Sequence, residues 1–330
     1  MRNWAELHGD SFDGVRVLIT GGAGFIGSHL AEALSQLGAS VVVLDDLSGG
    51  SRENLTSFGP VEFVEGSILD KPVVARATRG CRFVFHQAAL GSVPRSVEQP
   101  RLYNSVNTEG TLNVLEAARE AGVARVMFAA SSSAYGENPV PWVETMPVLP
   151  RSPYAATKVA GEALFRAYSA SYGLDTACLR YFNIFGPRQN ANSAYAAVIA
   201  AFAKALLSGS DPVIFGDGEQ SRDFTFVHNA VHANLLAARR PEQIAGEVLN
   251  VGCGASVSVN ALARVMGELL NAPRRQPVHR PERAGDLKHS FADVNRSKSV
   301  LGYEPIVDFR TGLEQTARWY ESVLSPSASV

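Results

Sequence analysis

The chain has 330 residues, of which 46% are hydrophobic and 19% are charged, and its formal net charge is -2. These values predict one or two globular domains and exclude a disordered or fibrous chain. Charges of both signs are mixed without long runs, so we expect no nucleic-acid and no membrane partner. The three cysteines stand far apart, which predicts neither a metal site nor a disulfide framework. The N-terminal region lacks the apolar core of a signal peptide, so we expect a cytoplasmic protein.

Short runs rich in β-branched residues alternate with longer helical patterns along the first half of the chain. Strands are predicted at residues 15–20, 41–44, 61–64, 83–86 and 126–130. Helices are predicted at residues 26–37, 106–121 and 154–172. This alternation predicts an α/β fold with a Rossmann-type, doubly wound parallel sheet that helices cover on both faces.

The sequence changes in character after residue 180, where turns that contain glycine and proline separate shorter elements. Helical spacing returns at residues 259–270 and 309–323. We therefore expect a dinucleotide-binding domain at residues 1–180 and a smaller, loop-rich substrate lobe at residues 181–330. Some interleaving of the chain between the two parts is also expected.

A glycine-rich segment lies between the first predicted strand and the first predicted helix. Its sequence is Thr20-Gly21-Gly22-Ala23-Gly24-Phe25-Ile26-Gly27. Gly21 allows a tight turn, Gly24 lets the backbone approach a pyrophosphate, and Gly27 lets the helix pack closely on the strand. Because the N-terminus of a helix offers free N–H groups to phosphate oxygens, we predict a dinucleotide site here that includes Phe25 and Ile26.

A carboxylate ends the second predicted strand. Asp45 lies where such a group accepts hydrogen bonds from both hydroxyls of the adenosine ribose. Asp46 follows directly, and two carboxylates would repel the 2′-phosphate of NADP, which favours NAD as the cofactor. Asp46 has an alternative role, because aspartate also caps turns. Arg52 is the nearby cation that would argue for NADP instead.

Tyr154 and Lys158 stand four positions apart at the start of a predicted helix, which puts both side chains on one face. Oxidation of an alcohol needs a base, and a phenolate serves if its pKa falls. Lowering a tyrosine pKa from about 10 to about 7 takes roughly 4 kcal/mol. An ammonium about 6 Å away contributes roughly 2.8 kcal/mol at an effective dielectric constant near 20. We therefore predict that Lys158 and the positively charged nicotinamide activate Tyr154 together.

Three consecutive serines, Ser131, Ser132 and Ser133, follow the strand predicted at residues 126–130. They stand at the edge of the sheet where open α/β folds bind ligands. One of the hydroxyls is expected to bond the reacting oxygen and pass its proton to Tyr154. The others are expected to end the strand and cap a turn.

Several of these segments together resemble the extended short-chain dehydrogenase/reductases. They are residues 20–27, the serines before Tyr135-Gly136, and Ser152-Pro153-Tyr154 with Lys158. Four further segments resemble nucleotide-sugar epimerases, namely residues 181–187, Gly216-Asp217-Gly218, Arg222-Asp223-Phe224 and Arg283-Ala284-Gly285-Asp286. The resemblance implies an NAD-dependent UDP-sugar 4-epimerase, and a homodimer formed through the helices at residues 106–121 and 154–172.

The resemblance also implies roles for the matching residues. Tyr154 is the base and Lys158 its electrostatic partner, with Ser132 as the favoured proton relay and Ser131 as its rival. The further cofactor-binding positions are Ser67, Ile68, Gln87, Ala88, Ala89, Asn107 and Tyr181. The substrate-binding positions are Ser92, Arg95, Ser133, Asn183, Tyr195, Ala196, Val198, Arg222, Arg283, Asp286 and Ser290.

Among the substrate positions, Arg222 and Arg283 are expected to hold the diphosphate, because the guanidinium fork suits phosphate oxygens. Asn183 is expected at the diphosphate or sugar, and Asp286 at the nucleotide ribose. Ser67 replaces an aspartate that bonds adenine in many relatives, so a weaker contact is expected there.

Ser290 stands where glucose-selective epimerases carry a bulky tyrosine. A small residue leaves room for an N-acetyl group at C2, because packed sites tolerate little overlap. Residues 91–96 and 195–199 also resemble bacterial UDP-N-acetylglucosamine 4-epimerases. These features favour UDP-N-acetylglucosamine and UDP-N-acetylgalactosamine as substrates, with UDP-glucose and UDP-galactose as further candidates.

Three alternative functions stay open. A 4-epimerase of UDP-N-acetylglucosaminuronate or UDP-glucuronate would need a cation for the C6 carboxylate, and Arg95 is a candidate. A nucleotide-sugar dehydratase or decarboxylase is disfavoured, because the serine run contains no carboxylate. A non-catalytic NAD-sensing protein is disfavoured by the presence of both Tyr154 and Lys158.

Overall fold

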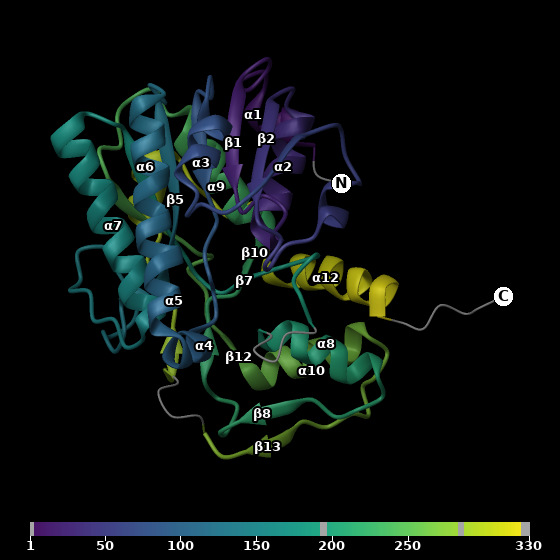
Figure 1. Cartoon of the computed structure of the whole chain (residues 1–330). Coiled ribbons are helices and arrows are strands. Elements are labelled where there is room, and N and C mark those ends of the chain that lie inside the picture. The colour runs from purple at the N-terminus through teal and green to yellow at the C-terminus, as the bar shows by residue number, and fades with distance from the viewer. Residues whose placement is uncertain (1–2, 192–196, 283–286, 325–330) are drawn as a thin grey trace.

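A parallel sheet forms the centre of the protein, which a computed structural model describes at residues 3–191, 197–282 and 287–324 (Figure 1). Its strands are β1 (Arg16–Thr20), β2 (Ser40–Asp45), β3 (Glu62–Glu65), β4 (Phe83–His86), β5 (Arg125–Ser131), β6 (Thr176–Tyr181) and β11 (Glu247–Val251). They lie in the order β11-β6-β5-β4-β1-β2-β3, and every neighbouring pair is parallel. The Rossmann-type fold predicted from the sequence is therefore confirmed.

Helices cover both faces of this sheet, because its strands carry apolar side chains on both faces. The helices of the two layers are α1 (Trp4–His8), α2 (Phe25–Gln36) and α9 (Val227–Arg239) on one face, and α3 (Lys71–Thr78), α6 (Gly110–Glu120) and α7 (Pro153–Tyr172) on the other. In β1, Val17 and Ile19 belong to the core with α2 and α9, whereas Leu18 belongs to the core with α3 and α6. This alternation follows from the two-residue period of a strand.

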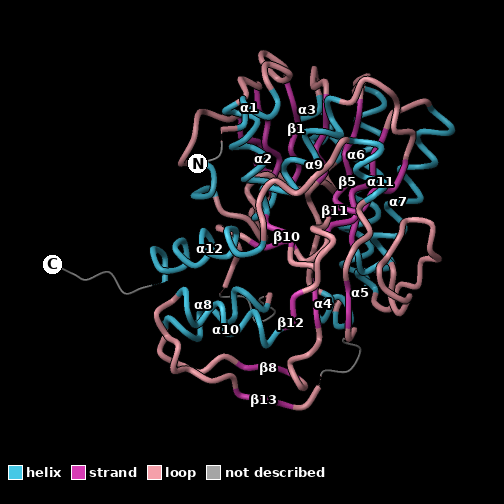
Figure 2. Tube along the Cα trace, turned by 180° about the vertical axis from the view of Figure 1, so that it is seen from behind, coloured by secondary structure: helices cyan, strands magenta, loops and turns pink. Residues whose placement is uncertain are grey.

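The substrate lobe has a core of its own beside the end of the sheet (Figure 2). Its helices are α8 (Val198–Leu207), α10 (Val259–Leu269) and α12 (Phe309–Leu324). Its strand pairs are β8 (Val213–Phe215) with β13 (Val278–Arg280), β7 (Ile184–Phe185) with β10 (Thr225–Phe226), and β9 (Ser221–Arg222) with both β12 (Val257–Ser258) and β14 (His289–Ser290). The chain interleaves between the lobes, because β11 and α9 come from beyond residue 180, and β11 joins the central sheet while α9 packs on one of its faces.

Short elements complete the described fold. They are α4 (Val93–Glu98), α5 (Pro100–Asn104), a π-helical turn (Ser105–Glu109), α11 (Asn295–Leu301) and two 3-10 turns (Arg52–Leu55 and Ser132–Ala134). The helix predicted at residues 106–121 therefore begins as the π-helical turn and continues as α6. Within the described residues, no helix has both the length and the apolar character that a membrane span requires.

The strand order changes direction between β1 and β4. From β1 the chain builds outward through β2 and β3, and then it crosses back to β4 and builds toward β5 and β6. The loops after β1 and β4 diverge at this point, which leaves a crevice at the carboxyl ends of the strands. The glycine-rich turn follows β1, so the topology places it at this crevice.

Candidate active site

A cleft with a volume of about 1480 Å³ opens at the carboxyl edge of the sheet, between the two lobes. It is lined by these predicted site residues: Gly21, Gly24, Phe25, Ile26, Gly27, Asp45, Asp46, Ile68, Gln87, Ala88, Ala89, Ser92, Arg95, Ser131, Ser132, Ser133, Tyr154, Lys158, Tyr181, Asn183, Arg222 and Ser290. Four other predicted residues, Tyr195, Ala196, Arg283 and Asp286, lie outside the described residues. Within the described ranges no cluster of side chains has the composition of a metal site.

The glycine-rich turn forms one end of the cleft, and its geometry leaves no space for side chains. Gly21 has a φ of +68°, and a Cβ on it would lie 2.7 Å from the Cα of Ala88. A Cβ on Gly27 would lie 2.1 Å from the carbonyl oxygen of Gly21, and one on Gly24 would lie 3.2 Å from the same oxygen. Helix α2 begins here, and no side chain in the described part of the protein caps its first N–H groups. The turn therefore fits the pyrophosphate of a dinucleotide.

Asp45 ends the neighbouring strand β2 and faces the same crevice. Its Oδ2 accepts the N–H of Ala23 at 2.9 Å, and its Oδ1 accepts the N–H of Leu47 at 2.8 Å. Burial raises the pKa of this carboxyl, while the two N–H donors act against the rise. Asp46 also lines the cleft, but its Oδ1 accepts the N–H and the hydroxyl of Ser48 at 3.0 and 2.5 Å. Asp45 thus lines the cleft beside the glycine-rich turn, and Asp46 caps a turn.

Two residues predicted to bind the cofactor, Ser67 and Asn107, are not among the residues that line the cleft. Ser67 accepts the N–H of Leu69 at 3.2 Å in a tight turn. Asn107 accepts the N–H of Leu90 at 2.8 Å, and it donates to the carbonyl of Leu90 and to the hydroxyl of Thr157, both at 3.1 Å. Asn107 therefore ties the loop after β4 to helix α7 and supports the wall of the cleft from behind.

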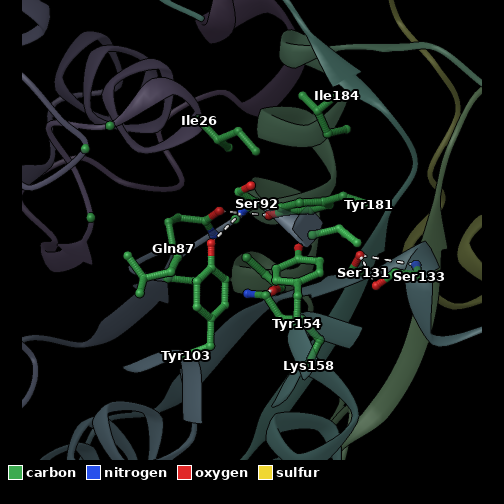
Figure 3. Close-up of a pocket in the computed structure, with 18 of the residues that line it drawn as sticks. Ile26, Gln87, Ser92, Tyr103, Ser131, Ser133, Tyr154, Lys158, Tyr181 and Ile184 are labelled. Carbon is green, nitrogen blue, oxygen red and sulfur yellow. Dashed lines mark hydrogen bonds between the residues drawn. The ribbon is translucent and has the colours of Figure 1, made fainter. Parts of the chain in front are cut away.

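Tyr154, Lys158 and Ser131 meet in the cleft at the end of β5 (Figure 3). Ser152 caps α7 by accepting a backbone N–H of the first turn at 3.1 Å, and this turn carries Tyr154. The side chain of Ser131 interacts with Tyr154 and acts to lower the pKa of the phenol. The Nζ of Lys158 donates to the carbonyl of Ala129 at 2.7 Å and lies 5.9 Å from the centre of the Tyr154 ring. A phenol, a hydroxyl and an ammonium thus converge next to the dinucleotide turn.

Of the three serines, Ser131 is the one whose side chain acts on the pKa of Tyr154. Its Oγ also lies 2.9 Å from the Oγ of Ser133 and accepts the N–H of Ser133 at 3.2 Å. Ser132 lines the cleft as the first residue of the 3-10 turn. Strand β5 ends at Ser131, and the interaction of this residue with Tyr154 favours Ser131 as the proton relay, the reverse of the ranking that the resemblance implied.

Burial changes the pKa values of the two catalytic groups in opposite directions. It raises the pKa of Tyr154, and the interaction with Ser131 counteracts only part of this rise. It lowers the pKa of Lys158 to about 8, while Glu162 acts in the other direction. The described protein groups therefore give a net rise in the Tyr154 pKa, in which burial outweighs the interaction with Ser131, and not the predicted fall.

The substrate lobe supplies the other end of the cleft. Arg222 lies in β9, and its Nη1 donates to two backbone carbonyls at 2.9 and 3.3 Å. Ser290 pairs with Arg222 across β14 and β9, and it is 5% exposed. Asn183 has a φ of +36° and donates to the carbonyl of Asp223 at 3.2 Å. Three residues predicted to bind substrate are thus neighbours on one short sheet and the loop beside it.

A smaller cavity of about 260 Å³ adjoins the cleft and shares Asn183 and Arg222 with it. Val198, the first residue of α8, lines this cavity instead of the main cleft. Phe215 and Gln220 also line it, and the side chain of Gln220 is fixed by donating to the carbonyl of Phe215 at 2.7 Å. The cavity therefore combines an apolar ring surface with polar groups at its border.

Two residues of the site were not recognised in the sequence. Tyr103 of α5 lines the cleft, is 1% exposed, and accepts the N–H of Ser92 at 3.1 Å. Asp223 is fully buried and accepts three backbone N–H groups, at 2.8, 2.9 and 3.2 Å, from the segments at residues 253–254 and 292. It fixes the chain that carries Arg222 and Ser290. The Arg-Asp-Phe motif was the available signal for Asp223, whereas no local pattern marks Tyr103.

Comparison with known proteins identifies the family. The model of the NAD dependent epimerase/dehydratase family matches residues 17–252. The UDP-glucose 4-epimerase of Mycolicibacterium smegmatis is 41% identical over 314 residues, which cover 93% of this chain and 99% of that protein. The solved structure of the UDP-N-acetylglucosamine 4-epimerase from Methanobrevibacter ruminantium, in complex with UDP-N-acetylmuramic acid, has a TM-score of 0.90 and 40% identity, and it covers 94% of this chain and 100% of that one.

A third relative is similar along the same length. The Thermus thermophilus UDP-glucose 4-epimerase, solved as a complex with NAD, has a TM-score of 0.84 and 36% identity, and it covers 96% of this chain and 100% of that one. The glycine turn and Asp45 described above fit the cofactor of that family. The chain therefore belongs to the NAD dependent epimerase/dehydratase family, as an NAD-using enzyme with UDP-sugar 4-epimerases among its relatives.

Proposed function

We propose that this protein is a UDP-sugar 4-epimerase that interconverts UDP-N-acetylglucosamine and UDP-N-acetylgalactosamine. The observation that carries the proposal is the meeting of Ser131, Tyr154 and Lys158 beside a turn that fits a dinucleotide. A base, a hydroxyl relay and a cation at this position are the groups that oxidation and re-reduction of an alcohol require.

The residues of the cleft have distinct tasks in this reaction. When bound, NAD supplies an acceptor and later a donor for the hydride at C4 of the sugar. Tyr154 takes the proton of the C4 hydroxyl, and Ser131, whose side chain interacts with Tyr154, holds the reacting oxygen. Lys158, held by the carbonyl of Ala129, stabilises the phenolate. Return of the same proton after the 4-keto sugar has turned over restores the hydroxyl, so no net oxidation occurs.

The far end of the cleft anchors the part of the substrate that does not react. Arg222 and Asn183 line both the cleft and the smaller cavity, so a diphosphate between them would place its nucleoside in that cavity. The Phe215 ring there offers a surface for a uracil base. These groups lie far from the reacting carbon, so their binding energy does not depend on the orientation of the sugar. They therefore retain the 4-keto sugar while the sugar ring turns.

The size of Ser290 supports an N-acetylhexosamine over a plain hexose. Its side chain lines the cleft and is almost completely buried, so a larger residue there would occupy space next to the sugar. A dehydratase or decarboxylase has less support, because the turn at residues 131–133 contains no carboxylate. The cleft-lining carboxylates in the described residues are Asp45, Asp46 and Glu98, and the first two lie at the NAD end.

The test follows inversion at C4 by NMR for UDP-N-acetylglucosamine and UDP-glucose with the NAD-loaded enzyme. We expect the acetylated substrate to react faster, and Ser290→Tyr to lower its kcat/KM relative to that of UDP-glucose by roughly 10- to 200-fold. UDP-glucose serves as the internal reference, since the variant leaves its binding surface unobstructed at C2. Faster turnover of UDP-glucose by the wild type would overturn the substrate assignment, and absence of inversion with every sugar would overturn the epimerase assignment.

A further inference from the structure

His86 is the last residue of strand β4 and is 1% exposed. The segment that follows it, residues 87–90, lines the cleft. The Nδ1 atom of His86 lies 2.7 Å from the hydroxyl oxygen of Thr20, which ends β1, and its Nε2 atom lies 2.9 Å from the hydroxyl oxygen of Thr111 in α6. Both threonines are also buried. A buried polar network in which every group is paired specifies one arrangement of the segments that carry it, so these contacts bear on the geometry of the cleft.

The hydrogen bond between His86 and Thr111 has a defined direction. The hydroxyl proton of Thr111 is donated to the carbonyl oxygen of Asn107 at 2.6 Å. Because a hydroxyl has a single proton, the Thr111 oxygen must accept a proton from the Nε2 atom of His86. Burial, together with the charge of Lys158, lowers the pKa of His86 to about 3. The ring is therefore neutral near neutral pH, and its one proton is on Nε2.

The same reasoning gives the direction of the hydrogen bond on the other side of the ring. A neutral ring with its proton on Nε2 has an unprotonated Nδ1 atom, which accepts the hydroxyl proton of Thr20. The Thr20 oxygen in turn accepts the N–H of Ala88 at 3.3 Å. The bonds therefore form a single series, the His86 chain, which runs from Ala88 through Thr20, His86 and Thr111 to the carbonyl of Asn107.

Both ends of the His86 chain hold the loop after β4. One end is the N–H of Ala88. At the other end, the Asn107 side chain accepts the N–H of Leu90 at 2.8 Å and donates to the carbonyl of Leu90 at 3.1 Å. Asn107 also donates to the hydroxyl of Thr157 at 3.1 Å, and Thr157 donates to the carbonyl of Tyr154 at 2.8 Å. One buried network thus joins the loop to the helical turn that carries the base.

We infer that His86 is a positioning residue of the active site, which together with Thr20 and Thr111 holds the loop at residues 88–90 in a fixed position relative to Tyr154. This inference rests on the proposed 4-epimerase function and adds residues that set the geometry of its cleft. The loop lies against the glycine-rich turn, since Ala88 leaves no room for a Cβ on Gly21. A displacement of reacting groups by about 1 Å can slow a reaction roughly 10²-fold, so the His86 chain acts on kcat more than on KM.

The packing of the His86 ring has to be separated from its hydrogen bonds. The centroid of the ring lies 5.7 Å from that of Phe128 and 6.5 Å from that of Phe165, and both pairs are stacked. A substitution of His86 would therefore disturb the core together with the hydrogen bonds. Removal of one threonine hydroxyl breaks the His86 chain and leaves the aromatic stack in place.

The first test is Thr111→Val in the NAD-loaded enzyme, because valine replaces the hydroxyl by a methyl group of similar size. We expect kcat for inversion of UDP-N-acetylglucosamine to fall about tenfold, as loss of a buried hydrogen bond implies, with little change in KM. Thr111→Ser keeps the hydroxyl and should restore most of the lost kcat. A normal kcat in Thr111→Val, or an equal loss in Thr111→Ser, would overturn the role of the His86 chain.

Thr78→Val is the matched control. Thr78 is fully buried in α3, and its hydroxyl donates to the carbonyl of Val74 at 2.8 Å, four residues earlier, as that of Thr111 does to Asn107. The two valine variants should therefore show similar falls in melting temperature. We expect kcat to fall in Thr111→Val alone. An equal fall in Thr78→Val would mean that lost stability explains the effect, and it would overturn the positioning role.

A double variant tests whether His86 links the two threonines. Within the described residues, Thr20 and Thr111 share no direct hydrogen bond, and each bonds a different nitrogen of His86. Residues of one hydrogen-bonded network show non-additive effects. We therefore expect Thr20→Val combined with Thr111→Val to lower kcat by less than the product of the two single effects. Independent effects that multiply would overturn the link.

The protonation of the ring is a readout that does not depend on turnover. Nitrogen-15 NMR of the histidine rings, with the His86 signals assigned by their loss in His86→Gln, should show a proton on Nε2 alone at neutral pH. A proton on Nδ1, or on both nitrogens, would overturn the direction of the His86 chain.

Failure of the proposed function gives a different result from failure of this inference. If no sugar is inverted, the 4-epimerase assignment is lost, and the rate at which bound NAD dissociates still tests the position of the loop. Faster release from Thr111→Val than from Thr78→Val would then support the inference, and equal rates would overturn it.

Discussion

The two ends of the cleft differ in which atoms form their surface: backbone atoms at one end and side chains at the other. At the NAD end, backbone atoms fill the space, and a Cβ on Gly27 would lie 2.1 Å from a carbonyl oxygen. At the reacting end, side chains of Ser131, Tyr154 and Arg95 define the surface, and each projects into the cleft from a separate element. Backbone geometry permits almost no substitution, whereas side chains can be exchanged one at a time. The NAD end therefore restricts which cofactor can bind, whereas substitutions at the reacting end can change which sugar is accepted.

The largest effect is expected from Gly27→Ala at the NAD end. The added Cβ would collide with the Gly21 carbonyl, so the turn must open and the pyrophosphate site is lost. We expect purified protein without bound NAD, a lower melting temperature and no detectable epimerisation. Bound NAD is measured by its absorbance after denaturation. Gly49→Ala is the control, because a Cβ there meets nothing within 4 Å, and normal NAD content in Gly27→Ala would contradict the prediction.

Tyr154→Phe should abolish chemistry while leaving the NAD end intact. Removal of the phenol eliminates the base, and losses of about 10²- to 10⁴-fold in kcat are typical of such groups. NAD content and melting temperature should stay near those of the wild type. Tyr172→Phe, which alters an exposed tyrosine on the same helix, serves as the comparison. Loss of NAD from Tyr154→Phe would show that the two ends are not separable.

Ser131→Ala should lower kcat more than Ser132→Ala. Of the three serines, Ser131 is the one whose side chain interacts with Tyr154, and loss of a hydrogen bond to the reacting oxygen worth about 1.4 kcal/mol slows the reaction roughly tenfold. Ser132→Ala removes a hydroxyl from the turn and should change kcat by about twofold or less, as surface substitutions usually do. The two rates are measured side by side at saturating substrate. Equal losses, or a larger loss in Ser132→Ala, would restore the ranking that family resemblance implied.

The smallest effect concerns acid stability of the NAD-binding half, where burial lowers the pKa values of His8, His29 and His86 to about 3. Because the unfolded chain takes up protons near the ordinary histidine pKa of about 6.5, it binds more protons than the folded chain between these values. The stabilising contribution is therefore complete above pH 6.5 and falls as the pH drops toward 3. Urea unfolding at several pH values measures this slope.

Histidine variants from the two lobes provide the comparison for that slope. His8→Gln should flatten it, because His8 is buried against His232 at 3.1 Å. His289→Gln in the substrate lobe should leave it unchanged, since His289 is exposed. Identical slopes in all three proteins would contradict the assignment of acid sensitivity to the NAD-binding half.

The sequence predicted most of the sheet, because its strands are short apolar runs between helical periods. The strands predicted at residues 41–44 and 83–86 agree with β2 and β4 within a residue or so at each end. The dinucleotide turn was also predictable, since a single local motif contains all of its parts. By contrast, the sequence could not show which of Ser131, Ser132 and Ser133 is the proton relay. Three consecutive serines have the same chemistry and differ only in where the backbone points their side chains.

Other features of the site depend on contacts between distant segments. Asn107 was expected at the surface of the cleft, yet it bonds Leu90 and Thr157 behind the wall. Tyr103 was missed because its role depends on the loop at Ser92 and on the base in α7. The rise in the Tyr154 pKa could not be foreseen either, since the degree of burial is a property of the assembled lobes.

The position of β11 has a consequence for how the protein is made. When residue 180 leaves the ribosome, β6 lacks its outer neighbour, because Glu247–Val251 has not yet been synthesised. Until then β6 presents an open edge, which is a template for pairing with another nascent chain. The same order means that a fragment ending after β6 would be a poor choice for recombinant production.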